Sequence, residues 1–368
     1  MRVLIITNLS KGNSATLPER NLFIGLHLKG VDVTVLAESP SSESLDLESA
    51  GIRLLYQPIT RKIDIPAIRK IRSLLRKEKY DILHFTYSKA ISNGLIASYG
   101  IKVRTIGYLG SLSVHWHDPF SYFSFLNPGL DRLICVSDGV NEHVLKQLPA
   151  RMKNRTIRIY KGSNPEWLNN VVPARRCDLG IPENAFVVCC VANIRKSKGV
   201  KWLIESANFL PANLPLWFLL VGDKTDSNVV RKRIRKTKYP DNFITTGYSA
   251  EPNAFTSICD LYIQPSVSEG LPKSVIEAMC LKKPVIVTER GGAKELVIEG
   301  INGYIIPVRS AKAIAETILK CYENRDNLSA MGEKGMERIK NYFSHQMTID
   351  STFNLYRELM ERKSDRLF

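Results

Sequence analysis

Two glutamates, Glu269 and Glu277, stand eight positions apart in the run SVSEGLPKSVIEAM of residues 266–279. The Gly-Leu-Pro of residues 270–272 predicts that a helix begins there, so Glu269 precedes the helix and Glu277 lies about one turn inside it. A helix N-terminus offers unpaired N–H groups and a partial positive charge to a phosphate, while carboxylates accept hydrogen bonds from hydroxyl groups. The pattern therefore suits a ligand that is part sugar and part phosphate.

Short apolar runs alternate with helical patterns along the chain, which is typical of parallel sheets covered by helices on both faces. The run before Glu269 ends a strand at Gln264, and a helix over Lys273–Leu281 follows the loop. Both glutamates are thus expected at the carboxyl edge of a sheet, where such folds bind ligands. The expected strands are Val3–Thr7, Val31–Leu36, Ile82–Phe85, Lys102–Tyr108, Arg132–Val136, Thr156–Tyr160, Phe186–Ala192, Leu216–Val221, Asn242–Thr246, Leu261–Gln264, Pro284–Thr288 and Tyr304–Ile306.

A break in these patterns falls at residues 163–185, which are rich in proline, asparagine and charge. We place the domain boundary at Pro165, which gives a first domain over 1–165 and a second over 166–343. Residues 344–368 read as a terminal helix that packs back towards the first domain. The fold class is therefore α/β, with two Rossmann-like doubly wound parallel sheets facing a central cleft.

Bulk composition indicates a protein that folds in water. The chain has 368 residues, 44% of them apolar and 24% charged, and no apolar run approaches the roughly 20 residues of a membrane span. The start, MRVLIITNLSKGNS, fits a buried strand better than a secretory signal. Seven cysteines, without CxxC spacing, suit a reducing compartment. We expect a cytoplasmic location.

Positive charge is the unusual bulk property, with 52 Lys and Arg against 36 Asp and Glu, a net +16. Its densest part, RKIDIPAIRKIRSLLRKEK over Arg61–Lys79, has eight basic and two acidic residues and an apolar stripe at helical spacing. Its outer face could simply be solvated. It could also contact an anionic membrane surface, which would make the protein peripheral on the inner face of the plasma membrane, or an anionic saccharide. No nucleic-acid partner is expected, because no binding motif accompanies the charge.

The run around Glu269 and Glu277 resembles the glutamate-x7-glutamate motif of family 4 glycosyltransferases. These enzymes are retaining, use nucleotide sugars and have the GT-B fold. Five stretches resemble the family in order and spacing: VVCCVANIRKSKGVKWLIE at 187–205, FLLVGD at 218–223, CDLYIQPS at 259–266, PVIVTERGGAKELV at 284–297 and NGYIIP at 302–307.

The resemblance implies that residues 1–165 bind the acceptor and residues 166–343 bind the nucleotide sugar, and it implies a role for each matching residue. Glu277 would bind the donor ribose, and Glu269 would face the sugar ring as a catalytic residue that orients and stabilises without a covalent link. The diphosphate would be held by cations, by backbone and by the helix dipole, which stabilise the charge that develops on the leaving group. These donor-binding residues are Arg195, Lys198, Gly270, Leu271, Pro272 and Lys273, with Gly247 and Tyr248 at the nucleobase. Because the family often has an arginine where this chain has Asn193, Arg195 is interpreted as a shifted substitute.

The first half departs from the family pattern. The paired glycines of the first loop are reduced to Gly12, beside the donor phosphate, and Leu109 stands where many members have a histidine near the sugar. His117 and His115 follow a few residues later, and we take His117 as the candidate catalytic histidine. His84, at a strand end, either braces the fold or touches the ligand.

The sequence thus predicts a retaining hexosyltransferase that needs no metal, since no DxD element is present. No cofactor is expected beyond a UDP- or GDP-linked donor substrate. The acceptor would be a saccharide or a lipid-linked sugar, in surface polysaccharide, lipopolysaccharide or glycolipid synthesis. Two alternatives stay open: a UDP-sugar 2-epimerase of the same fold, and an inactive nucleotide-sugar-binding scaffold.

Overall fold

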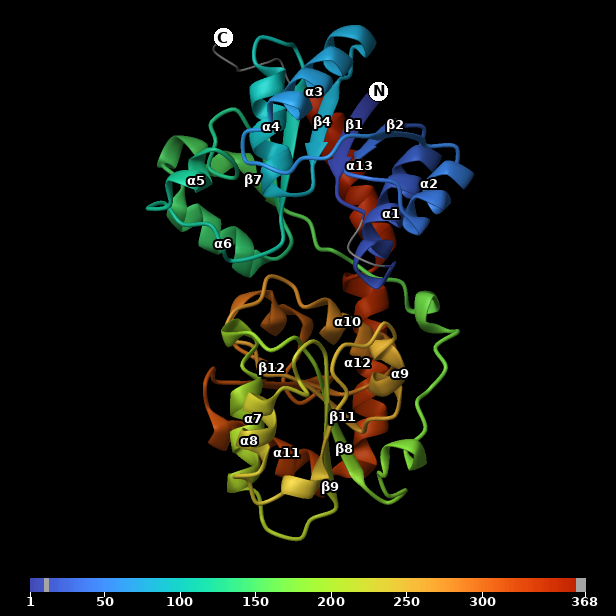
Figure 1. Ribbon diagram of the computed structural model, residues 1–368, viewed down its shortest axis with the longest axis vertical. Coiled ribbons are helices and arrows are strands. Elements are labelled where there is room, and N and C mark those ends of the chain that lie inside the picture. The colour runs from blue at the N-terminus through green and yellow to red at the C-terminus, as the bar shows by residue number, and fades with distance from the viewer. Residues whose placement is uncertain (10–12, 362–368) are drawn as a thin grey trace. The chain divides into compact units, whose positions relative to one another are not determined.

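The computed structural model describes residues 1–9 and 13–361, and the chain divides into two compact units (Figure 1). Unit 1 comprises residues 1–162 together with the segment from His345 on, and unit 2 comprises Ser163–Ser344. None of the helices within the described residues is both long and apolar enough to span a bilayer.

Unit 1 is built on a seven-stranded sheet in the order β3-β2-β1-β4-β5-β6-β7, and all neighbouring pairs are parallel. The order reverses beside β1, as in doubly wound folds. Six of the strands were predicted, whereas β3 was not. The strands are β1 (Arg2–Thr7), β2 (Asp32–Ala37), β3 (Arg53–Tyr56), β4 (Ile82–Phe85), β5 (Arg104–Leu109), β6 (Arg132–Cys135) and β7 (Thr156–Arg158).

Helices cover both faces of this sheet because alternate strand residues point to opposite sides. Val3 and Ile5 of β1 face a core shared with α1 and α13, which lie side by side (Figure 1). On the opposite face α4 packs on β4 so closely that a Cβ at Gly94 would meet the Phe85 ring. The helices are α1 (Asn13–Leu28), α2 (Leu45–Ser49), α3 (Ile65–Glu78), α4 (Ser88–Ser98), α5 (Pro119–Tyr122), α6 (Asp138–Gln147) and α13 (His345–Glu361).

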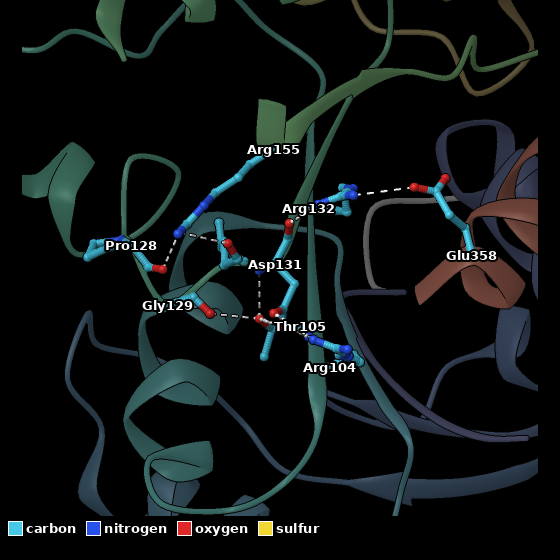
Figure 2. Close-up of polar contacts among 9 residues, drawn as sticks. Arg104, Thr105, Pro128, Gly129, Asp131, Arg132, Arg155 and Glu358 are labelled. Carbon is cyan, nitrogen blue, oxygen red and sulfur yellow. Dashed lines mark hydrogen bonds and ion pairs between the residues drawn. The ribbon is translucent and has the colours of Figure 1, made fainter. Parts of the chain in front are cut away.

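Several polar contacts fix α13 on unit 1. The Tyr356 hydroxyl lies 2.6 Å from Nδ1 of His84, which is buried at the end of β4. Burial lowers the pKa of His84 to about 4, so this imidazole is neutral at physiological pH. Arg132 of β6 donates to Glu358 at 3.3 Å (Figure 2). His84 could either brace the fold or touch a ligand, and the structure shows a contact that braces the fold.

The chain leaves unit 1 three residues before the predicted boundary at Pro165. Thr348 of α13 donates its hydroxyl to the Tyr160 carbonyl and accepts from Gly162 N–H, both within unit 1. Ser163 N–H instead donates to the Phe343 carbonyl, within unit 2. The hydrogen bonds therefore change partner between Gly162 and Ser163, where the compositional break of residues 163–185 begins.

Unit 2 holds a six-stranded parallel sheet in the order β10-β9-β8-β11-β12-β13. Helices α7, α8 and α11 cover one face, and α9, α10 and α12 the other (Figure 1). All six strands were predicted. The strands are β8 (Phe186–Val191), β9 (Leu216–Val221), β10 (Phe243–Thr245), β11 (Leu261–Gln264), β12 (Val285–Thr288) and β13 (Gly303–Ile306); the helices are α7 (Val200–Ser206), α8 (Asn228–Ile234), α9 (Pro252–Ser257), α10 (Lys273–Cys280), α11 (Ala311–Glu323) and α12 (Leu328–Tyr342).

Candidate functional site

The loop between β11 and α10 carries Glu269 in a set of polar contacts. Its carboxylate accepts hydrogen bonds from Lys198 Nζ at 2.5 Å and from Ser266 Oγ at 3.0 Å. The Glu269 side chain is only 14% exposed. Because a half-buried carboxylate needs such partners, they fix the position of this charge at the carboxyl edge of the sheet.

A buried polar chain beneath Glu269 was not predicted from the sequence. Gln264, the last residue of β11, donates Nε2 to Ser266 Oγ at 2.9 Å, and its carbonyl accepts from Tyr262 at 2.9 Å and Ser274 at 3.1 Å. Burial holds the pKa of Tyr262 well above its usual value, so its hydroxyl remains a donor. In the sequence, these hydrogen-bonded side chains could have been identified from the glutamine and the serine that follow the apolar residues of β11, because both are buried and buried polar groups need partners.

The loop that carries Lys198 packs directly on the loop that carries Glu269. Val267 N–H donates to the Ser197 carbonyl at 2.7 Å, and Lys198 ends a 3₁₀ turn (Lys196–Lys198). Gly199 follows with φ +68°, and a Cβ there would lie 1.9 Å from the Pro265 carbonyl oxygen. Only glycine fits both the left-handed backbone and the close approach, which brings Lys198 to Glu269.

Glu277 lies on the first turns of α10, as predicted. Its carboxylate accepts from Lys273 Nζ at 2.5 Å and from Asn253 Nδ2 of α9 at 3.4 Å, and the side chain is 12% exposed. The helix forms because Val275, Ile276 and Met279 are buried against the sheet and α12. Glu277 is not among these buried residues, so its carboxylate remains partly accessible.

The N-terminus of α10 combines the positive end of the helix dipole with two lysines, each of which is paired with a glutamate. Pro272 is the N-cap residue and supplies no side-chain cap, and the first turn contains no acidic residue. Lys273 stands at the first helical position, where a cation opposes the helix dipole. Lys198 adds a second cation beside this loop, where it pairs with Glu269. Such a concentration of positive charge at a helix N-terminus favours a bound anion.

Arg195 and Gly247 lie at two other carboxyl ends of the sheet, after β8 and β10. Arg195 is exposed, and within the described residues its side chain has no hydrogen bond or ion pair. Gly247 has φ +70°, and its N–H and carbonyl are bonded to Thr225 Oγ1 and Gly222 N–H. Tyr248 beside it is exposed. Asn193 Oδ1 accepts a hydrogen bond from Asp223 N–H at 2.9 Å, so the side chain of Asn193 is engaged within the protein.

The candidate residues of the first half belong to unit 1. His115 and His117 stack with ring centroids 5.3 Å apart, and His143, whose Nε2 bonds the Val114 carbonyl, meets His115 edge-on. Both His115 and His117 are exposed. Leu109 is the buried last residue of β5, so this position presents no side chain to a ligand. Gly12 lies outside the described residues.

The described part of the chain offers few groups for metal or thiol chemistry. Among residues 1–9 and 13–361, no three His, Cys, Asp or Glu side chains come together as ligands for a metal ion. Burial raises the pKa of Cys190, beneath Lys198 and Glu269, to about 12, which keeps the thiol neutral. The charged groups of the site in unit 2 are thus its lysines, arginine and two glutamates.

Comparison with known proteins places this chain among glycosyltransferases. Residues 172–338 match the family model of glycosyl transferases group 1, and residues 20–167 match that of glycosyltransferase family 4. The two models together span most of the chain, and the protein belongs to the family 4 glycosyltransferases.

Individual relatives agree over nearly the full length. The capsular polysaccharide biosynthesis glycosyltransferase CapM of Staphylococcus aureus is 23% identical over 93% of both chains. The UDP-Gal:alpha-D-GlcNAc-diphosphoundecaprenol alpha-1,3-galactosyltransferase of Escherichia coli is 23% identical over 90% of both. A crystal structure of Anabaena HepE in complex with UDP covers 97% of this chain and 100% of its own, at 19% identity and a TM-score of 0.79. The prediction of a GT-B fold with two parallel-sheet domains is confirmed.

Proposed function

We propose that the protein is a retaining, metal-independent hexosyltransferase that uses a UDP- or GDP-linked sugar. The observation that carries the proposal is the N-terminus of α10, where Lys273 and Lys198 stand with two half-buried carboxylates. Cations at a helix N-terminus suit a diphosphate, and the carboxylates suit hydroxyl groups. The E. coli relative is named for UDP-Gal, and the HepE structure contains UDP, which supports this type of donor.

In the proposed complex, Arg195, Lys198, Lys273 and the backbone of residues 270–272 bind the diphosphate. Glu277 accepts hydrogen bonds from the ribose. Gly247 and Tyr248 lie at the base; because the N–H and the carbonyl of Gly247 are both bonded within the protein, the Tyr248 side chain makes the main contact there. Gly12 remains proposed as a phosphate contact on the resemblance alone.

Transfer would proceed on one face of the sugar. The bond from the anomeric carbon to the β-phosphate oxygen breaks, the bond to the acceptor oxygen forms, and the acceptor proton passes to the departing phosphate. Lys198 and Arg195 stabilise the charge that grows on that phosphate. Glu269, held by Lys198 and Ser266, orients the sugar ring without a covalent link.

Unit 1 would supply the acceptor side, with His117 as the catalytic histidine and His115 stacked against it. We propose a saccharide or lipid-linked acceptor in surface polysaccharide, lipopolysaccharide or glycolipid synthesis, because CapM and the E. coli relative are named for such products. A cytoplasmic location fits the free cysteines, one of which, Cys177, is exposed.

The test is a panel of nucleotide sugars incubated with the protein, with and without oligosaccharide and polyprenyl-linked acceptors, followed by nucleotide release and NMR of the new anomeric bond. Acceptor-dependent release with a product of the donor's anomeric configuration is expected. Epimerised nucleotide sugar without an acceptor would identify an epimerase. Donor binding without release or epimerisation across the panel would identify an inactive scaffold.

If transfer is found, His117→Ala should lower kcat roughly 100-fold or more, as for a group that assists proton transfer or sugar binding. His115→Ala is the matched variant, since it removes the stacked neighbour from the same exposed loop. Equal, small effects of the two variants would remove His117 from the catalytic group.

A further inference from the structure

A group of large apolar side chains is exposed on unit 1, in two segments. One segment is the stretch 116–123 around α5, termed here the aromatic segment, where Trp116 is 63% and Phe120 54% exposed and Tyr122 and Phe123 are also exposed. The other is the start of α3, where Ile65 is 58% exposed. Single exposed apolar residues are ordinary, but a group of them marks an interaction surface.

The two segments are in contact. The Lys62 ammonium, three residues before α3, lies 2.9 Å from the centroid of the Phe120 ring. A cation over an aromatic face at this distance is attractive, and here it joins the aromatic segment to the basic helix. The exposed apolar groups and the start of α3 therefore belong to one surface.

Along α3 this surface is basic and its charge is not neutralised. Arg69, Lys70, Arg76 and Lys77 are exposed, and none of them forms an ion pair with another described residue. The two acidic residues of the stretch are engaged elsewhere: Asp64 is the buried N-cap of α3, and Glu78 pairs with Arg2 and Arg53. Arg72 holds the end of α4 through the Ala97 and Tyr99 carbonyls.

The aromatic segment is held in place at both ends. Asp118 caps α5 by accepting from Phe120 N–H at 3.1 Å and from Ser121 Oγ at 3.2 Å. Beyond the segment, Asp131 accepts from Thr105 N–H at 2.7 Å, and Thr105 donates its hydroxyl to Gly129, which ties the returning chain to β5 (Figure 2). Its side chains are thus presented to solvent by a fixed support.

We propose that this surface docks the protein onto an anionic lipid bilayer. Lysine and arginine bind the headgroups, while the tryptophan and phenylalanine rings and the isoleucine enter the interface, where aromatic rings are favoured. A polysaccharide or nucleic acid would account for the charge but not for exposed isoleucine beside it. The proposal is independent of donor chemistry and needs no transfer activity.

The experiment is sedimentation of the full-length protein with vesicles of phosphatidylcholine containing about 30% phosphatidylglycerol, with pure phosphatidylcholine as reference. Binding to the anionic vesicles that weakens with salt is expected. Neutralising Arg69, Lys70, Arg76 and Lys77 to Gln should lower the partition coefficient by roughly two to three orders of magnitude. Phe120→Ser should lower it roughly 10-fold.

A matched control removes the same charge from unit 2. Arg231, Lys232, Arg235 and Lys236 are also exposed, and their change to Gln should leave binding within a few-fold of wild type. Equal loss in the two variants would mean that only net charge matters and would overturn the proposal. So would the absence of vesicle binding, or capture by soluble heparin without it.

Tryptophan fluorescence locates the contact even if a variant folds poorly. Of the four tryptophans, Trp116 lies in the aromatic segment, so a blue shift on adding anionic vesicles should vanish in Trp116→Phe and persist in Trp202→Phe, in unit 2. A shift that survives in Trp116→Phe would place the contact elsewhere and refute the proposed surface.

Discussion

Replacing Glu277 by glutamine tests the donor site most directly, because the change removes one charge and almost no volume. The carboxylate now accepts from Lys273 and, more weakly, from Asn253. Hydrogen bonds from ribose hydroxyls to an ionised carboxylate contribute about 1.5–3 kcal/mol, so Glu277→Gln should weaken UDP or GDP binding about 10- to 100-fold.

The effect on folding should be far smaller. The contact with Lys273 is an i,i+4 pair on a helix, worth about 0.3–0.5 kcal/mol when exposed, and the amide still accepts a hydrogen bond. Glu316→Gln is a matched control, since Lys312 and Glu316 form the same i,i+4 pair on α11 of the same unit. Calorimetric titration with UDP and GDP measures affinity, and thermal unfolding measures stability. An unchanged affinity for both nucleotides in Glu277→Gln, or an equal loss in Glu316→Gln, would refute the assignment.

Four further outcomes are expected. Lys198→Met should weaken UDP binding about 10- to 100-fold but leave uridine binding unchanged, and a second change, Glu269→Gln, should recover lost stability without recovering UDP affinity. Lys273→Gln should weaken UDP similarly with little change in melting temperature, because relief of a cation that opposes the dipole of α10 offsets the loss of the ion pair with Glu277. Burial lowers the pKa of His84 from 6.5 to about 4, so as pH falls the unfolded chain takes up a proton before the folded protein does. About 3 kcal/mol of stability, which is complete above pH 6.5, is therefore lost as pH falls towards 4. Denaturant titrations at a series of pH values should show a shallower loss in His84→Gln. EDTA should leave transfer within twofold of the untreated rate, whereas a larger loss that Mg²⁺ restores would show a metal requirement.

The sheets could be predicted because parallel strands are apolar on both faces and read as continuous runs. All six strands of unit 2 appear where such runs occur. Strand β3 was not predicted; it is a four-residue edge strand, Arg53–Tyr56, with an exposed residue at each end, and its apolar run is short. The predicted boundary at Pro165 lies three residues from the one at Gly162, because hydrogen-bond partners on α13, almost two hundred positions away, set its place.

The placement of the proposed donor-side residues at the carboxyl edge of the sheet could be predicted because their order along β11, its loop and α10 follows a local pattern. Their partners could not, since Lys198 meets Glu269 only after Gly199 lets two loops pack, and Asn253 reaches Glu277 from α9. In the sequence Gln264 is only a polar residue at the end of a strand. Its burial is what makes it the centre of the hydrogen bonds beneath Glu269.

Where the sequence disagrees with local stability rules, it points to the ligand. Lys273 stands at a helix start that favours acidic residues, α10 lacks a side-chain cap, and Glu269 is half-buried beside a loop held against it by a left-handed glycine. Each feature costs stability in the free protein. In the proposed complex each would be offset by a diphosphate bound to the N–H groups and lysines and by hydroxyls bound to the carboxylates, because the anion would face the dipole and the cations together. In the free protein Lys198 and Lys273 pair with Glu269 and Glu277 instead, so the donor must take over a share of these two lysines, and its diphosphate should contribute more to affinity than its base.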